Sequence, residues 1–285
     1  METGLEMTAQ IAIARSLEDL RRQVAGWRAS GEKIALVPTM GALHAGHLSL
    51  VHRAREHAER VVVSIFVNPT QFAPTEDLAE YPRTFEADCA ALDGLADLVY
   101  APDASTMYPE GSCTAIELEG PATAGLEDRF RPTHFRGVAT VVAKLLIQAL
   151  PDYATFGEKD YQQLEVVTRM AQDLFIPVTI LPVPTMREPD GLAMSSRNRY
   201  LAPAERALAP LLHATLQACA SRIRAGEPID LAIAEARTTI AAAGFAIDYL
   251  EARDVALGPA VADRPIRLLV AASIGQTRLI DNIPV

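Results

Sequence analysis

Residues 37–51 read VPTMGALHAGHLSLV, and the rest of the fold can be predicted outward from this stretch. The apolar run KIALV at residues 33–37 predicts a buried parallel strand, which we expect Pro38 to end. Beyond the glycine-containing turn, apolar residues recur at helical spacing, so His47 falls in the first turn of a helix. The stretch therefore predicts a strand, a tight turn and a helix start.

Two histidines lie at this helix start. His44 precedes His47 by three residues, so both imidazoles can face one phosphate at a helix N-terminus, where unpaired N–H groups favour an anion. Gly41 and Gly46 let the backbone bend and approach a ligand closely. A zinc site is not expected, because the H-E-x-x-H pattern has a glutamate and a spacing of four. Two solvated histidines remain an alternative until a second motif supports the phosphate site.

Strand-like and helix-like segments alternate along most of the chain. This alternation predicts an α/β fold with a Rossmann-like parallel sheet in residues 1–185 and a smaller α+β C-terminal lid domain in residues 186–285. The expected parallel strands are residues 33–37, 60–67, 97–101, 152–156 and 178–183, with helices at 84–92 and 137–150 and at most one short strand at 114–118. The C-terminal part is expected to hold helices at 203–225 and 229–243 and strands at 246–252, 267–273 and 277–280.

Polar residues follow two of these strands. Asn68 and Gln71 come directly after the second strand, and Lys159 comes just after the fourth. Because ligands sit beyond the carboxyl ends of parallel strands, these side chains are candidates to bind a small polar substrate and phosphate oxygens. Asp160 and Gln163 share one helix face and can both reach the same cleft. Ordinary turn chemistry and a solvated helix start are the alternatives for these residues.

The second motif, DGLAMSSRNRYL at residues 190–201, follows the last expected parallel strand. Ser195 and Ser196 offer hydroxyls and Arg197 offers a planar cation suited to phosphate. In this position the segment can act as a hinged loop over a nucleotide. A flexible polar linker would have a similar composition.

The composition describes a globular protein and excludes several classes. Of 285 residues, 49% are hydrophobic and 22% are charged, and the formal net charge of −10 argues against a nucleic-acid surface. Cys89, Cys113 and Cys219 form neither a disulfide framework nor a zinc cluster, so a reducing cytoplasm is expected. The N-terminus lacks the pattern of a signal peptide, and the longest uncharged apolar stretch is too short to span a membrane.

Taken together, the motifs resemble a known family. H-x-G-H and M-S-S-R resemble the paired signatures of the HIGH-motif nucleotidyltransferase superfamily, and VPTMGALHAGHLSLV, FVNPTQF, HFRGVATVVAKL, FGEKDYQQL and DGLAMSSRNRYL in this order resemble the pantoate–beta-alanine ligase family. The resemblance implies that ATP, (R)-pantoate and beta-alanine give pantothenate, AMP and pyrophosphate through a pantoyl adenylate. It also implies Mg²⁺ held mainly by ATP and a homodimer built through the larger domain. Where the superfamily has a lysine in its second signature, this chain has Ser196 followed by Arg197, so Arg197 is the expected cation.

The resemblance also assigns roles to individual residues. His44, His47, Lys159 and Arg197 are the expected catalytic groups, and Gln71, Gln163 and Asn68 are the expected substrate-binding groups. The expected ATP-binding positions are Met40, Gly41, Ala42, Leu43, His44, Ala45, Gly46, His47, Gly157, Glu158, Lys159, Asp160, Met186, Met194, Ser195, Ser196 and Arg197.

Other functions remain to be weighed against this one. A nucleotidylyltransferase would stop at adenylyl transfer and release a stable adenylated product. A regulatory module would bind ATP without releasing pyrophosphate. A tRNA synthetase is disfavoured by the acidic composition.

Overall fold

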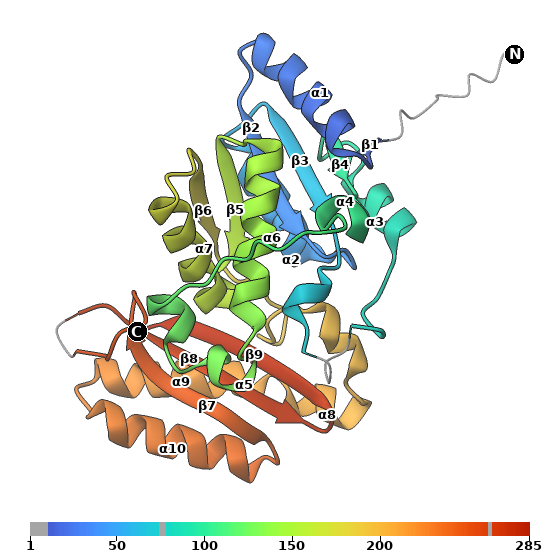
Figure 1. Ribbon diagram of the computed structural model, residues 1–285. Coiled ribbons are helices and arrows are strands. Elements are labelled where there is room, and N and C mark those ends of the chain that lie inside the picture. Colours follow the sequence, from blue (N-terminus) through green and yellow to red (C-terminus); the bar gives the residue numbers. More distant parts are fainter. Residues whose placement is uncertain (1–10, 74–77, 262–263) are drawn as a thin grey trace, which may run out of the picture.

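The computed structural model describes residues 11–73, 78–261 and 264–285. Its larger part is built on a six-stranded sheet with the order β1-β4-β3-β2-β5-β6, and every neighbouring pair is parallel (Figure 1). The strands are β1 (Ala12–Ala14), β2 (Ile34–Thr39), β3 (Arg60–Ile65), β4 (Leu98–Tyr100), β5 (Tyr153–Gly157) and β6 (Thr179–Val183). The predicted α/β class with a parallel N-terminal sheet is confirmed.

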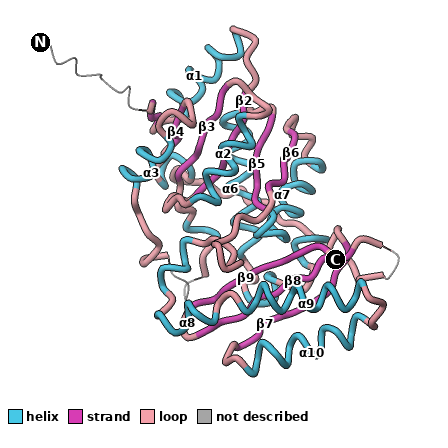
Figure 2. The backbone as a smooth tube through the Cα atoms, turned by 180° about the vertical axis from the view of Figure 1, so that it is seen from behind, coloured by secondary structure: helices cyan, strands magenta, loops and turns pink. Residues whose placement is uncertain are grey.

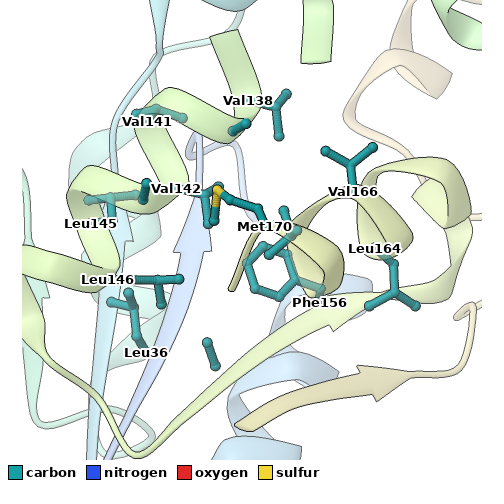
Figure 3. Close-up of a cluster of buried hydrophobic side chains, with 14 of the residues drawn as sticks. Leu36, Val138, Val141, Val142, Leu145, Leu146, Phe156, Leu164, Val166 and Met170 are labelled. Carbon is teal, nitrogen blue, oxygen red and sulfur yellow. The ribbon is translucent and has the colours of Figure 1, made fainter. Parts of the chain in front are cut away.

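Helices cover both faces of this sheet. Alternate residues of β2 point to opposite sides, so Ile34 and Leu36 pack in one core and Ala35 and Val37 in another. The first core contains residues of α1 (Leu17–Ala29), α6 (His134–Ala149) and α7 (Tyr161–Asp173), and the second contains residues of α2 (Ala45–Arg55) and α3 (Phe85–Leu92). Figure 3 shows side chains of α6 and α7 packed around Leu36 and Phe156 in the first core.

The strand order creates a switch point in the sheet. From β2 the chain moves to β3 and β4 on one side and later to β5 and β6 on the other. Open α/β sheets bind ligands beyond the carboxyl ends of the strands at such a point. Short helices and 3-10 turns complete the larger part, namely η1 (Pro69–Gln71), α4 (Ala104–Met107), η2 (Gly120–Thr123), α5 (Glu127–Phe130) and η3 (Glu158–Asp160).

The C-terminal part has its own sheet and core. Its strands β7 (Ala246–Asp254), β8 (Ile266–Ile274) and β9 (Thr277–Pro284) are antiparallel in the order β7-β8-β9. Figure 2 shows α9 (Leu211–Arg224) and α10 (Ile229–Ala242) lying along this sheet, and their side chains share its hydrophobic core. The turn η4 (Ser196–Tyr200) and α8 (Pro203–Leu208) connect the two parts. The predicted smaller α+β part is confirmed.

One prediction about β2 is wrong in an informative way. The strand does not end at Pro38 but continues to Thr39. The carbonyls of Lys33 and Thr39 accept hydrogen bonds from the N–H groups of Arg60 and Phe66, on the β3 side. Successive residues of a strand direct their backbone N–H and C=O groups to opposite neighbours, so Pro38 faces β5. The pairing of β2 with β5 ends at Leu36, and the missing N–H of Pro38 therefore breaks no ladder bond.

Other elements also differ from expectation. The edge strand β1 was not predicted, and residues 114–118 form no strand because the N–H of Ile116 donates to the Thr140 hydroxyl of α6. Helix α6 begins at His134 rather than at residue 137. The expected helix 203–225 is two helices, because Pro210 cannot continue a helix. Within the described residues, no helix has the length and apolar character needed to cross a membrane.

Candidate active site

A single cleft beside the carboxyl ends of β2 and β5 brings together the two distant motifs. Both the 40–47 loop and the 194–197 segment line it, together with the turn that follows β5. The predicted site residues that line this cleft are Met40, His44, Gly46, His47, Asn68, Gln71, Gly157, Lys159, Asp160, Gln163, Met186, Met194, Ser195, Ser196 and Arg197. Gly41, Ala42, Leu43, Ala45 and Glu158 are not among the residues that line it.

Asp88 holds the loop that precedes α2. This aspartate lies on α3, is only 3% exposed, and accepts hydrogen bonds from the N–H groups of Ala42 (3.0 Å) and Leu43 (2.8 Å). Gly41 has a φ of +82°, a conformation suited to glycine, and a Cβ there would approach Asp88 Oδ2 to 3.0 Å. This role of Asp88 was not predicted from the sequence. The available signal was an acid placed between Phe85 and Leu92 on the apolar face of a predicted helix.

In both histidines, Nδ1 is hydrogen-bonded to the backbone, and this leaves Nε2 for other partners. His44 is the N-cap of α2, and its Nδ1 accepts from the N–H of Gly46 at 3.1 Å. His47 Nδ1 in turn accepts from the N–H of His44 at 3.3 Å, and the two ring centroids are 4.1 Å apart. Because both Nδ1 atoms accept, each neutral ring carries its proton on Nε2. The pair thus presents two N–H donors without needing a positive charge.

Both imidazoles are held neutral in the structure. Burial, followed by the charges of Lys159 and Arg199, lowers the pKa of His44 to about 4. Burial, followed by the proximity of His44 and Lys159, lowers the pKa of His47 to about 3. Arg199 was not among the predicted site residues. Lys159 contributes to both shifts and lines the same cleft as the two rings.

We expect the imidazole titrations to move when ATP binds. Without ligand, His44 and His47 should stay neutral from pH 8 to about pH 5, and the triphosphate charge should raise both pKa values. Because these folded-state values lie below the ordinary 6.5, the two groups weaken the fold as the pH falls below about 6.5. Imidazole ¹⁵N NMR at several pH values, with and without ATP, measures both pKa values, and chemical denaturation at pH 8 and pH 5 measures the loss of stability. A midpoint near 6.5 for either ring in the free protein would contradict the proposed burial.

The turn after β5 presents Lys159. Gly157 ends the strand, and the 3-10 turn η3 leads directly into α7. Lys159 and Asp160 line the cleft, whereas the Glu158 carboxylate pairs with Arg267 of β8 at 3.2 Å. The Glu158 side chain is therefore directed toward the C-terminal sheet, although its backbone belongs to the predicted ATP-binding turn.

The loop after β3 presents Gln71. Its Nε2 lies 3.1 Å from the sulfur of Met40, and its Oε1 accepts from Asn68 Nδ2 at 3.1 Å. The Asn68 amide also donates to the carbonyl of Gly137 and accepts from Thr70 and Tyr108. Asn68 is 1% exposed. In this structure it fixes the loop and orients Gln71, so direct binding of substrate by Asn68 stays a prediction.

The M-S-S-R segment also lines the cleft. The N–H of Met194 donates to the carbonyl of Met186 at 3.0 Å, which forms a narrow hairpin in front of η4. Ser195 caps η4 by accepting from the N–H of Arg197 at 3.2 Å. The Arg197 guanidinium lies 5.9 Å from the ring centroid of Tyr81, a cleft residue that was not predicted from the sequence.

The cleft has few candidate metal ligands. In the described ranges, no group of three or more histidine, cysteine, aspartate or glutamate side chains is arranged to hold a metal ion. Among the described residues that line the cleft, Asp160 is the one with a carboxylate side chain. A single carboxylate fits a magnesium ion bound mostly by phosphate and water oxygens.

Comparison with known proteins identifies the family. The family model for pantoate-beta-alanine ligase matches residues 12–284. The chain belongs to the pantoate–beta-alanine ligase family. As a member of this family it is a ligase that forms an amide bond, which confirms the resemblance seen in the motifs.

Relatives and solved structures agree with this assignment. The pantothenate synthetase of Nitrobacter hamburgensis is 59% identical over 278 residues, which cover 96% of this chain and 98% of that one. A pantothenate synthetase crystal structure from Thermus thermophilus is 44% identical with a TM-score of 0.90, covering 96% of this chain and 99% of that chain. The Francisella tularensis ligase, solved with beta-gamma ATP and beta-alanine, is 33% identical with a TM-score of 0.79 over 96% and 97% of the two chains.

Proposed function

We propose that this ligase condenses (R)-pantoate with beta-alanine in the cleft between the 40–47 loop and the 194–197 segment, using ATP and passing through a pantoyl adenylate. The observation that carries this proposal is the convergence of both motifs and Lys159 on one cleft. Donors contributed by three separate segments of the chain suit a triphosphate, whose charge is distributed along its length.

In the first step, a pantoate carboxylate oxygen attacks the α-phosphorus of ATP. A P–O bond forms to pantoate while the bond from the α-phosphorus to the bridging oxygen breaks, and pyrophosphate leaves. Negative charge grows on that leaving oxygen, so nearby donors lower the barrier. The Nε2–H groups of His44 and His47 and the ammonium of Lys159 are the proposed donors, with Arg197 and the two serine hydroxyls holding the phosphates from the other side.

In the second step, the amine of beta-alanine attacks the activated carbonyl carbon. A C–N bond forms, the C–O bond to the phosphate breaks, and AMP leaves while the nitrogen loses a proton. No covalent bond to the protein is required, so the protein contributes by positioning the reactants and excluding water.

Mg²⁺ fits this cleft as a partner of ATP. Asp160 is the residue proposed to contact the ion or its water shell, beside the phosphate donors. The ion would neutralise part of the phosphate charge when bound. Lys159 and Arg197 would perform the same task from the protein side.

Pantoate is proposed to bind beside Gln71 and Gln163. Amide side chains can hydrogen-bond its hydroxyl groups without repelling its carboxylate. Both glutamines line the cleft, and the apolar side chains of Val138, Val141 and Val142 lie on the same wall. This mixture of amides and branched apolar groups suits a small branched hydroxy acid.

Changing Gln71 to alanine should chiefly weaken pantoate binding. We expect the KM for pantoate to rise about tenfold through the loss of hydrogen bonds, while the KM for ATP changes less than about twofold. Steady-state kinetics with each substrate varied in turn measures this. Gln23→Ala, an exposed position on α1, is the control. Equal losses for both substrates would count against this placement of pantoate.

A product assay tests the proposed function. AMP and pyrophosphate should form in equal amounts with pantothenate, and AMP should appear only when both pantoate and beta-alanine are present. A stable adenylated product released without beta-alanine would favour the nucleotidylyltransferase alternative. ATP binding without pyrophosphate release would favour a regulatory module. We further propose a homodimer, as the family resemblance implies, and a cytoplasmic location, as the cysteine usage predicts. Residues 186–285 are proposed to act as a lid domain.

A further inference from the structure

Strand β9 of the C-terminal sheet makes hydrogen bonds to two segments that contribute residues to the cleft. One is the turn η3, which carries Lys159, and the other is the hairpin that carries the M-S-S-R segment. Asn282 is 3% exposed, and its Nδ2 donates to the carbonyl oxygens of Glu158 at 2.8 Å and of Lys159 at 2.9 Å. Both amide protons of one side chain are therefore used on two successive carbonyls of the turn η3. This arrangement fixes the backbone from which the Lys159 side chain projects.

The orientation of the Asn282 amide is itself determined by its surroundings. Its Oδ1 accepts from the guanidinium of Arg267, which lies 3.9 Å from the ring centroid of Tyr161 and also pairs with the Glu158 carboxylate. An arginine can only donate, so the amide oxygen must face Arg267 and the amide nitrogen must face the carbonyls. Asn282 is thus locked in the orientation that holds the turn.

The preceding residue, Asp281, binds the hairpin that carries the M-S-S-R segment. Asp281 is 4% exposed and binds Arg187 through two hydrogen bonds of 2.7 and 2.9 Å. Arg187 lies at the base of the hairpin that carries the M-S-S-R segment, where it pairs with Ala193 and donates to the carbonyl of Gly191 at 3.1 Å. A buried bidentate pair of this kind restricts both position and angle.

Successive residues of a strand project to opposite sides, so one dipeptide can reach two different segments. We propose that Asp281 and Asn282 are positioning residues that set the separation between the M-S-S-R hairpin and the Lys159 turn, so that both can contact one triphosphate. The inference rests on the proposed ATP-binding roles of Lys159 and residues 194–197. It gives the C-terminal sheet a part in the reaction even though its strands supply no residue to the cleft that holds both motifs.

The test begins with Asn282→Asp. This change keeps the size of the side chain and the acceptor for Arg267, but replaces the two donors with a carboxylate facing two carbonyls. We expect the dissociation constant for ATP to rise about tenfold or more and that for pantoate to change less than about twofold. Asp281→Asn should weaken ATP binding similarly. Asn282→Ala provides a second variant that adds no charge. Calorimetry measures both constants, and a thermal scan reports folding.

The matched control is Tyr249→Phe. It removes a different buried hydrogen bond from the same sheet to the larger part, from the Tyr249 hydroxyl to Glu127 at 2.8 Å. We expect this variant to lower Tm while the ATP constant stays within about twofold of wild type. If all variants lower Tm and leave the ATP constant unchanged, Asp281 and Asn282 have only a structural role and the proposal is overturned.

A mutant cycle separates this proposal from the proposed site. If Asn282 acts through Lys159, Asn282→Asp should cause no further loss of ATP affinity in a Lys159→Met background, whereas the Asp281→Asn loss should persist there. Normal ATP binding and turnover by Lys159→Met alone would refute the role of Lys159. An impaired Lys159→Met whose loss is multiplied by Asn282→Asp would refute the positioning role alone.

Discussion

Replacement of Lys159 by methionine is expected to slow pyrophosphate release about 100- to 1000-fold. Methionine keeps an unbranched stem in the cleft but removes the charge that would stabilise the leaving phosphate oxygen, and the loss of one such donor typically has this size. The structure supports a strong effect, because Lys159 lines the same cleft as His44 and His47, and its charge contributes to the lowering of both pKa values.

Single-turnover measurement of pyrophosphate with saturating ATP and pantoate checks this expectation. Lys159→Arg should recover part of the rate, since it restores charge with a different shape. Lys33→Met is the control, because Lys33 is exposed and contacts Tyr153 outside the cleft. A rate within about threefold of wild type for Lys159→Met would remove Lys159 from the proposed chemistry.

Replacement of Gly46 by alanine is expected to reduce the adenylation rate about 100-fold with little loss of stability. A Cβ at this position would lie 2.8 Å from His44 Cε1 and 2.9 Å from His44 Nδ1. The imidazole can swing away from the new methyl group, so the fold survives. The displaced ring loses its bond to the Gly46 N–H and no longer presents its Nε2–H as a donor.

Gly26→Ala is the matched control for this change. Gly26 lies inside α1, and a Cβ there would meet no atom within 4 Å. Alanine should therefore stabilise that helix by about 0.5–1 kcal/mol and leave turnover unchanged. Chemical denaturation and single-turnover kinetics on both variants give the comparison. Full activity of Gly46→Ala would show that His44 is not held as described, and failure to fold would show that its ring cannot move aside.

The parts of the site that could be predicted from sequence are those built by local patterns. The strand, turn and helix around His44 and His47 follow from residues adjacent in the chain, and the Lys159 turn repeats the same design. The sheet then brings these segments together, because parallel strands end at one edge. The strand β1 was missed because three residues carry too little periodicity to predict a strand.

The residues that were not predicted depend on partners far away in the chain. Asp88 is recognisable only when the N–H groups of Ala42 and Leu43 are placed opposite it. Asn282 reads as an ordinary strand residue, because its partners are two backbone carbonyls that have no sequence signature. Positioning of this kind belongs to the tertiary structure, and sequence patterns do not reveal it.

Pro38 has a consequence for the shape of the sheet. Beyond Leu36, strands β2 and β5 make no further pairs, and both Pro38 and Phe156 line the cleft. Any other residue at position 38 would direct a backbone N–H toward β5 and allow the two strands to continue their pairing. The missing N–H of Pro38 thus helps to keep strands β2 and β5 unpaired at the centre of the sheet, where the cleft proposed to bind ATP opens.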